Sequence, residues 1–230
     1  MKHLVIALCC IVTISACTAT KGTGGHHGRH KEKMVEIVTD YGTMKIRLSD
    51  STPLHRDNFI KLVKQGFYDS LMFHRIIKDF MIQGGDPESK QAQGGSLLGN
   101  GEAAGGRVPA EFRPYLFHKK GALAMARDDN PEKASSNCQF YVVEGKVFTD
   151  SSLNDVECRR IRPHNPGFYF TDAQRKAYTT IGGAPHLDQN YTVFGEVIEG
   201  LDVIDKIAAQ PRDGNDRPLK DVRMKIRLLN

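Results

Sequence analysis

Short runs of alternating apolar and polar residues recur along this 230-residue chain and constrain its fold more than any other feature. The first run, at 34–48, is interrupted by Asp40-Tyr41-Gly42, which predicts a β-hairpin. Further strands are predicted at 73–77, around 81–83, and at 137–144, 191–199 and 222–228. Helical spacing of apolar residues is clear in two well-separated segments, 53–65 and 201–210. Because strands and helices do not alternate, the pattern excludes a parallel βαβ sheet and predicts an all-β-dominated, closed antiparallel barrel with helical end plugs.

One stretch, 73–86, carries an unusual combination of side chains within its strands. It reads FHRIIKDFMIQGGD and holds Arg75 and Gln83 on either side of Phe80 and Met81. A cation, an amide and two large apolar groups this close together indicate one half of a binding pocket. An edge strand whose Arg75 simply faces water fits the local pattern equally well, because a single motif is weak support.

The N-terminus predicts export and a lipid anchor. A short basic start precedes the apolar run 4–14, which has the length of a signal-peptide core and is too short to span a bilayer. The following Ser15-Ala16-Cys17 resembles a bacterial lipobox, so we expect a signal peptide at 1–16 and a lipidated Cys17 that attaches the chain to a membrane. An ordinary secretory signal with an incidental cysteine is the alternative. Because Thr18 is not aspartate, the expected location is the cell envelope, at the outer membrane facing the periplasm.

Residues 17–33 and the overall charge exclude several other functions. Glycine, threonine and charged residues without apolar periodicity predict a flexible tether at 17–33, followed by one folded domain at 34–230. The tether holds His26, His27 and His30, which could bind a metal ion adventitiously, but we assign no metal site and expect no cofactor. The net charge of +5 is modest and no lysine- or arginine-rich block occurs, so a nucleic-acid partner is not expected.

Two cysteines remain in the expected mature domain, and one long segment is rich in glycine. Cys138 and Cys158 could pair in an oxidising compartment, but two distant cysteines are not a disulfide framework, and we favour two free thiols with Cys138 buried. The glycine-rich segment 87–116 is too long for a simple connection and predicts a functional or Ω-type loop. It lacks the G-K-[ST] ending of a phosphate-binding P-loop.

Four segments together resemble a known family. They read FHRIIKDFMIQGGD at 73–86, GALAMAR at 121–127, CQFYVV at 138–143 and PHLDQNYTVFGEVIEGLDVIDKI at 185–207. In this order they are similar to the cyclophilin family of peptidyl-prolyl cis-trans isomerases, over residues 34–229. The resemblance implies an eight-stranded antiparallel barrel capped by two helices, with a peptide groove on its outside and rotation about X–Pro bonds as the activity.

The resemblance also implies roles for individual residues. Arg75 would donate a hydrogen bond to the proline nitrogen, and Gln83 would help to hold Arg75 and the substrate carbonyl, which makes these two the expected catalytic residues. The expected substrate-binding residues are Phe80, Met81, Ala126, Arg127, Gln139, Tyr141, His186, Leu187 and Tyr191.

Four of these positions depart from the family's usual residues. Tyr141 replaces a phenylalanine, which puts a hydroxyl at the floor of the proline pocket. Arg127 replaces an asparagine and adds a charge beside the groove, and Tyr191 stands where many members have histidine. His186 occupies the position of the tryptophan found in cyclosporin-sensitive members. We therefore expect weak cyclosporin binding with retained isomerase activity.

The segment 145–181 is longer than in a minimal cyclophilin and forms an insertion. Thr171 and Gln174 match a capping box, which predicts a short extra helix at 172–179. The basic cluster of Arg159, Arg160 and Arg162 could meet an acidic partner, although a solvated loop face explains it as well.

The resulting hypothesis is a monomeric isomerase that acts on proline-containing peptides and assists the folding of unfolded exported proteins. A non-catalytic proline-peptide-binding chaperone with the same groove is the alternative. The sequence contains neither a G-x-S-x-G elbow nor an H-E-x-x-H motif, which argues against a hydrolase.

Overall fold

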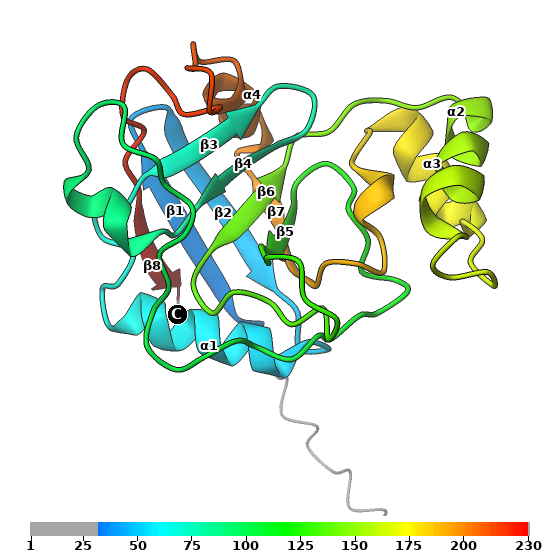
Figure 1. Cartoon of the computed structure of the whole chain (residues 1–230), viewed down its shortest axis with the longest axis horizontal. Coiled ribbons are helices and arrows are strands. Elements are labelled where there is room, and N and C mark those ends of the chain that lie inside the picture. The colour runs from blue at the N-terminus through cyan, green and yellow to red at the C-terminus, as the bar shows by residue number, and fades with distance from the viewer. Residues whose placement is uncertain (1–31, 230) are drawn as a thin grey trace, which may run out of the picture. The chain divides into compact units, whose positions relative to one another are not determined.

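The structure is a computed structural model that describes residues 32–229. The expected signal peptide at 1–16, Cys17, the three tether histidines and most of the tether lie outside these residues. Eight strands form one antiparallel sheet in the order β3-β4-β6-β5-β7-β2-β1-β8, curled into a half-barrel (Figure 1). The strands are β1 (Met34–Thr39), β2 (Gly42–Leu48), β3 (Phe73–Ile77), β4 (Met81–Gly84), β5 (Ala122–Met125), β6 (Phe140–Val143), β7 (Val193–Glu199) and β8 (Lys225–Leu229).

The first two strands show how the alternating pattern builds the core. β1 and β2 pair from Met34↔Arg47 to Thr39↔Gly42, as the hairpin prediction requires. Val35, Ile37, Met44 and Ile46 all point inward and are fully buried, because side chains two apart in a strand share one face. Each such side chain contributes about 1.5–3 kcal/mol of hydrophobic stabilisation. The hairpin is therefore held by its inward face.

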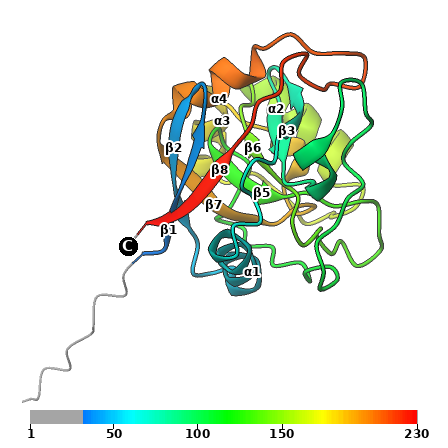
Figure 2. The same cartoon turned by 90° about the vertical axis from the view of Figure 1, so that its left-hand side faces the viewer.

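The predicted closure of the barrel is wrong, because no regular ladder joins the outer strands β3 and β8. The segment before β8 meets the chain before β3 through one isolated bridge, Met72↔Arg223, and a few backbone hydrogen bonds. The pairing of β3 with β4 shifts register between Phe73 and Arg75. Such a bulge bends and twists a strand locally. Figure 2 shows β8, in red, at the edge of the sheet beside β1.

Both predicted end helices form, α1 (Pro53–Lys64) and α4 (Leu201–Ala208). Phe59 of α1 is fully buried among aromatic rings of the sheet and its loops, with ring centroids 5.5 Å from Phe140 and 5.4 Å from Phe194. Two residues of the expected apolar helix faces lie outside the core, since Leu54 is 50% exposed and Leu201 41% exposed. Within residues 32–229, no helix combines the length and hydropathy that crossing a membrane requires.

The insertion contains two α-helices where the sequence predicted one. The predicted helix is α3 (Asp172–Thr180), and its capping box is present, since the side chains of Thr171 and Gln174 each accept a hydrogen bond from the other's backbone N–H. The missed helix is α2 (Asp150–Val156), continued by a π-helical turn, η2 (Glu157–Ile161). Thr149 and Ser152 cap α2 in the same reciprocal way, but serine at this position lies outside the Ser/Thr-x-x-Glu/Gln signature by which a sequence marks a helix start.

The insertion has a small hydrophobic cluster of its own. Buried side chains from both helices and the loop between them pack together, namely Leu153, Ile161, Phe168, Phe170 and Tyr178. Within residues 32–229 both cysteines are free and Cys138 is buried, as predicted, whereas Cys158 is exposed. Short 3-10 turns η1 (Pro87–Gln91) and η3 (Pro185–Leu187) flank the region where the groove was expected.

Candidate functional site

Arg75 and Gln83 lie opposite each other on the paired strands β3 and β4. Directly opposed residues of an antiparallel pair share one face, so both side chains point to the same side of the sheet. They line a cavity of about 300 Å³. Its other walls come from β4, β6, η3, the segment after β5 and the glycine-rich loop. Its full lining is His74, Arg75, Phe80, Met81, Gln83, Leu98, Gly99, Asn100, Ala126, Arg127, Tyr141, Leu187 and Tyr191.

The strand alternation separates this cavity from the main core. Ile82 of β4 and Phe140 of β6 point inward and are fully buried in the main cluster. Their neighbours Met81 and Tyr141 point to the other face, where they belong to a second apolar cluster with Leu187. The same period of two therefore builds both the core and the apolar wall of the cavity.

The Tyr141 hydroxyl is held by a buried chain of hydrogen bonds. It lies 3.0 Å from Nε2 of His118, and Nδ1 of His118 lies 2.8 Å from Oδ1 of Asp188. The other oxygen of Asp188 accepts a 2.7 Å hydrogen bond from the hydroxyl of Tyr178 in α3. Burial raises the pKa of Tyr141 well above its usual value, so the phenol stays neutral. The insertion is thus connected to the floor of the cavity through two intervening residues.

Gln139 fixes the glycine-rich loop. Its side-chain amide donates hydrogen bonds to the carbonyl oxygens of Gly99 (3.0 Å) and Gly101 (2.8 Å), and its own oxygen accepts one from Gln83 (3.3 Å). Gln139 lines a neighbouring cavity together with Gln83, Ala126 and Arg127 rather than the cavity of Arg75. The segment predicted to be a functional loop therefore supplies one wall of the site.

Arg127 folds back along the rim of the cavity. Its guanidinium carbon lies 4.8 Å from the ring centroid of Tyr191, and its Nε donates a 2.9 Å hydrogen bond to the carbonyl of Asn190. A positive charge therefore stands beside the groove, as the sequence suggested. His186 lines a larger adjoining cavity, and its ring lies 5.4 Å from that of Phe80.

Besides the glycine-rich loop residues Leu98, Gly99 and Asn100, two residues next to Arg75 were not predicted as part of the site. Asp216 lies 3.5 Å from Nε of Arg75 and anchors the base of its guanidinium, but it sits in an irregular loop without any periodic signal. His74 is 3% exposed, and neither ring nitrogen has a hydrogen-bond partner among residues 32–229. Burial above all lowers its pKa to about 4, so this side chain is neutral next to the Arg75 cation. The position of His74 directly before Arg75 in the sequence could have indicated that it lies at the site.

Residues 32–229 contain no cluster of three or more His, Cys, Asp or Glu side chains arranged to hold a metal ion. The site instead combines one anchored guanidinium, an amide and an apolar wall in a single cavity. The fold and this cavity together define a β-sheet protein that can receive a small apolar side chain of a peptide next to a hydrogen-bond donor.

Comparison with known proteins agrees with this description. The family model described as "Cyclophilin type peptidyl-prolyl cis-trans isomerase/CLD" matches residues 34–227. A Staphylococcus haemolyticus protein that is provisionally named a peptidyl-prolyl cis-trans isomerase is 36% identical over 192 residues, which cover 83% of this chain and 88% of that protein. A Streptococcus pyogenes protein provisionally named a bifunctional phosphatase/peptidyl-prolyl cis-trans isomerase is 35% identical over 84% of this chain but only 38% of its own length.

Solved structures of cyclophilins share the fold of this chain. A crystal structure of the Cryptosporidium parvum cyclophilin type peptidyl-prolyl cis-trans isomerase in the presence of the dipeptide Ala-Pro has 25% sequence identity and a TM-score of 0.60, covering 86% of this chain and 99% of that chain. The chain belongs to the cyclophilin-type peptidyl-prolyl cis-trans isomerases. Its activity is the cis-trans isomerisation of peptidyl-prolyl bonds.

Proposed function

We propose that Arg75 is the catalytic donor of this isomerase and that Phe80, Met81, Tyr141 and Leu187 hold the proline ring. The observation that carries this assignment is that the guanidinium and the four apolar side chains line one cavity of about 300 Å³. A proline ring packed against the apolar wall brings its nitrogen to the side of the cavity where Arg75 stands. Gln83, directly opposite Arg75, supports the substrate carbonyl.

The chemistry needs no nucleophile. Resonance in the X–Pro amide gives a rotation barrier of about 18–20 kcal/mol. In the twisted transition state the proline nitrogen becomes pyramidal and regains a lone pair, which accepts a hydrogen bond that neither planar isomer can accept as well. An arginine remains protonated and presents several N–H groups on a rigid fork, so it stabilises the twisted state selectively. Asp216 forms an ion pair with Nε of this guanidinium at 3.5 Å.

The test compares Arg75→Ala with the wild type in an NMR exchange assay on a proline peptide, which involves no coupling protease. Loss of one donor aimed at the transition state costs about 10²–10³-fold in rate. Arg227→Ala is the matched control, because Arg227 is 57% exposed, pairs with Glu36 of β1 and is not among the residues that line the Arg75 cavity. Equal rates for Arg75→Ala and wild type, with peptide binding intact, would instead favour the non-catalytic binding module.

We also propose that the isomerase is lipid-anchored through Cys17 at the outer membrane, where it acts on unfolded exported proteins. Support comes from the apolar run 4–14 and the small residues Ser15 and Ala16 before the cysteine. Cells that express the full chain are labelled with a tagged fatty acid and fractionated. The wild type should carry the label in the outer-membrane fraction, and Cys17→Ser should lose both label and membrane association. Labelling that survives the substitution contradicts the anchor.

A further inference from the structure

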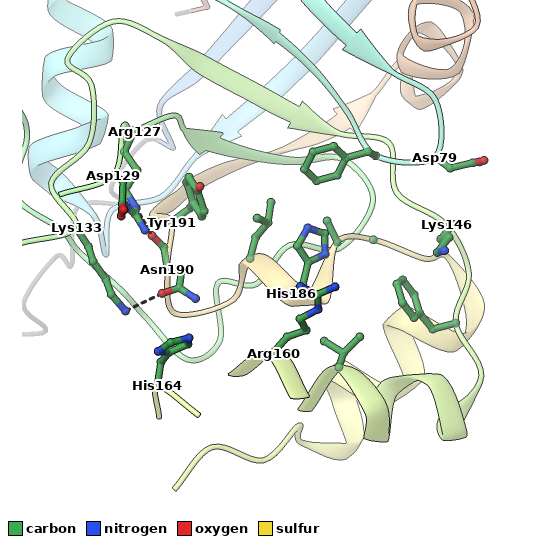
Figure 3. A pocket seen from close by; sticks show the side chains of 16 residues that line it. Asp79, Arg127, Asp129, Lys133, Lys146, Arg160, His164, His186, Asn190 and Tyr191 are labelled. Atoms are coloured by element: carbon green, nitrogen blue, oxygen red, sulfur yellow. Dashed lines mark hydrogen bonds and ion pairs between the residues drawn. The ribbon is translucent and has the colours of Figure 1, made fainter. Parts of the chain in front are cut away.

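The insertion builds a second cavity next to the proposed proline pocket. It has a volume of about 910 Å³ and lies between η2, η3 and the rim of the groove (Figure 3). Four residues, Phe80, Arg127, Leu187 and Tyr191, line both this cavity and the one that contains Arg75. The two cavities therefore share a wall. Because an extended chain advances about 3.3–3.6 Å per residue, a peptide with its proline in the first cavity reaches the second within a few residues.

The charged residues around the second cavity are mostly cationic. Its lining contains the four cations Arg127, Lys133, Lys146 and Arg160 against the two carboxylates Asp79 and Asp129. Asp129 is already engaged, since its carboxylate lies 3.7 Å from Arg127. Walls that carry an excess of one charge attract the opposite charge from a ligand.

Arg160 lines this cavity and differs from the other two arginines of the basic cluster in its contacts. Its chain neighbour Arg159 pairs with Asp155 at 3.5 Å, and Arg162 pairs with Glu157 and covers the ring of Tyr169. Arg160 makes no ion pair or side-chain hydrogen bond within residues 32–229. The basic cluster seen in the sequence is therefore divided: two of its members serve the insertion itself, and the third turns to the cavity.

Lys146 extends the same positive wall, and His186 lines it as a neutral imidazole. Lys146 is exposed and contacts the ring of Phe148, 5.6 Å from its centroid, without a carboxylate partner in the described part of the chain. In Figure 3, His186 lies beside Arg160, with Lys146 further along the wall. The pKa of His186 is lowered, chiefly because neighbouring atoms exclude water and also because Arg160 and Lys146 are close. All three residues line the second cavity.

We propose that this cavity binds the carboxylate side chain of an acidic residue near the proline of the substrate, with Arg160 and Lys146 as its specificity-determining residues. The inference rests on the proposed function, because it takes the Arg75 cavity to be the proline pocket. It assigns the insertion a role in substrate choice: proline peptides with a nearby Asp or Glu are preferred over neutral ones.

The test uses matched peptides that carry Glu or Gln at each of the three positions on either side of one proline. The kcat/KM of wild type should be about three- to tenfold higher for Glu than for Gln at the best position, as expected for one or two exposed charge pairs. This preference should shrink at high salt. Arg160→Gln and Lys146→Gln should each reduce the Glu/Gln ratio, and Arg159→Gln is the matched control that should keep it.

A ratio near one at every position for wild type, or an equal reduction by Arg160→Gln and Arg159→Gln, would overturn the proposal. Dissociation constants for the same peptides, measured by NMR titration, separate this failure from failure of the proposed function. If the chain has no isomerase activity, tighter binding of the Glu peptides that depends on Arg160 still supports the proposal that the cavity binds a carboxylate. If binding shows no such preference, the cavity does not recognise carboxylates.

Discussion

Replacing Tyr178 by phenylalanine removes one oxygen atom at the point where the insertion meets the wall of the site. Tyr178 is fully buried, and its hydroxyl donates the 2.7 Å hydrogen bond to Asp188. Its ring packs against those of Phe117, Phe148 and Phe170, at centroid distances of 5.5, 6.4 and 5.6 Å. Phenylalanine retains all three ring contacts, so Tyr178→Phe isolates the hydrogen bond.

The expected cost follows from the burial of Asp188. A hydrogen bond to a charged group contributes about 1.5–3 kcal/mol, and removing its donor leaves a buried oxygen unsatisfied. Asp188 keeps two other hydrogen bonds, both from His118, at 2.9 Å from the backbone N–H and 2.8 Å from Nδ1. We therefore expect a loss of about 2 kcal/mol in the free energy of unfolding, equivalent to a decrease of roughly 4–8 °C in Tm for a domain of this size.

Equilibrium denaturation in urea measures the change, with an unaltered m-value as the sign that only stability has changed. Tyr169→Phe is the matched control, because Tyr169 is 65% exposed and its hydroxyl makes no hydrogen bond within residues 32–229. It should alter stability by less than about 0.5 kcal/mol. If both substitutions have the same small effect, the Tyr178–Asp188 contact does not hold the insertion in place. A double-mutant cycle with Asp188→Asn should give a coupling energy above about 0.5 kcal/mol.

Two further predictions concern histidines. The pKa of His74 is about 4 in the folded state and near 6.5 in the unfolded state, so between these pH values the unfolded chain binds more protons. The free energy of unfolding should therefore fall by up to about 3 kcal/mol as the pH drops from 6.5 to 4. His74→Gln should flatten this part of the plot of stability against pH. An unchanged profile would show that His74 titrates normally. Cyclosporin should inhibit weakly because His186 lacks an indole, and His186→Trp should tighten inhibition about tenfold; nanomolar inhibition of the wild type would count against this reasoning.

The sequence by itself determined the elements that depend on local periodicity and local capping. Alternation at Val35, Ile37, Met44 and Ile46 defined a hairpin and its inward face, because in a strand the side of each residue follows from its position alone. The capping residues of α3 predicted its start in the same local way. The spacing of Arg75 and Gln83 around a short turn is likewise local, and the strands do place them opposite each other.

The tertiary structure decided which distant side chains meet. Asp216 reaches Arg75 from an irregular loop, and Tyr178 of the predicted helix α3 reaches His118 only through Asp188, a contact that no local pattern predicts. The barrel stays open because no ladder joins β3 and β8, and a hydrophobic pattern does not show which strand edges pair. The separation of Arg160 from its two basic neighbours depends on the turn of η2. Periodicity encodes which face a residue occupies, whereas the pairing of faces is fixed only when the whole chain packs.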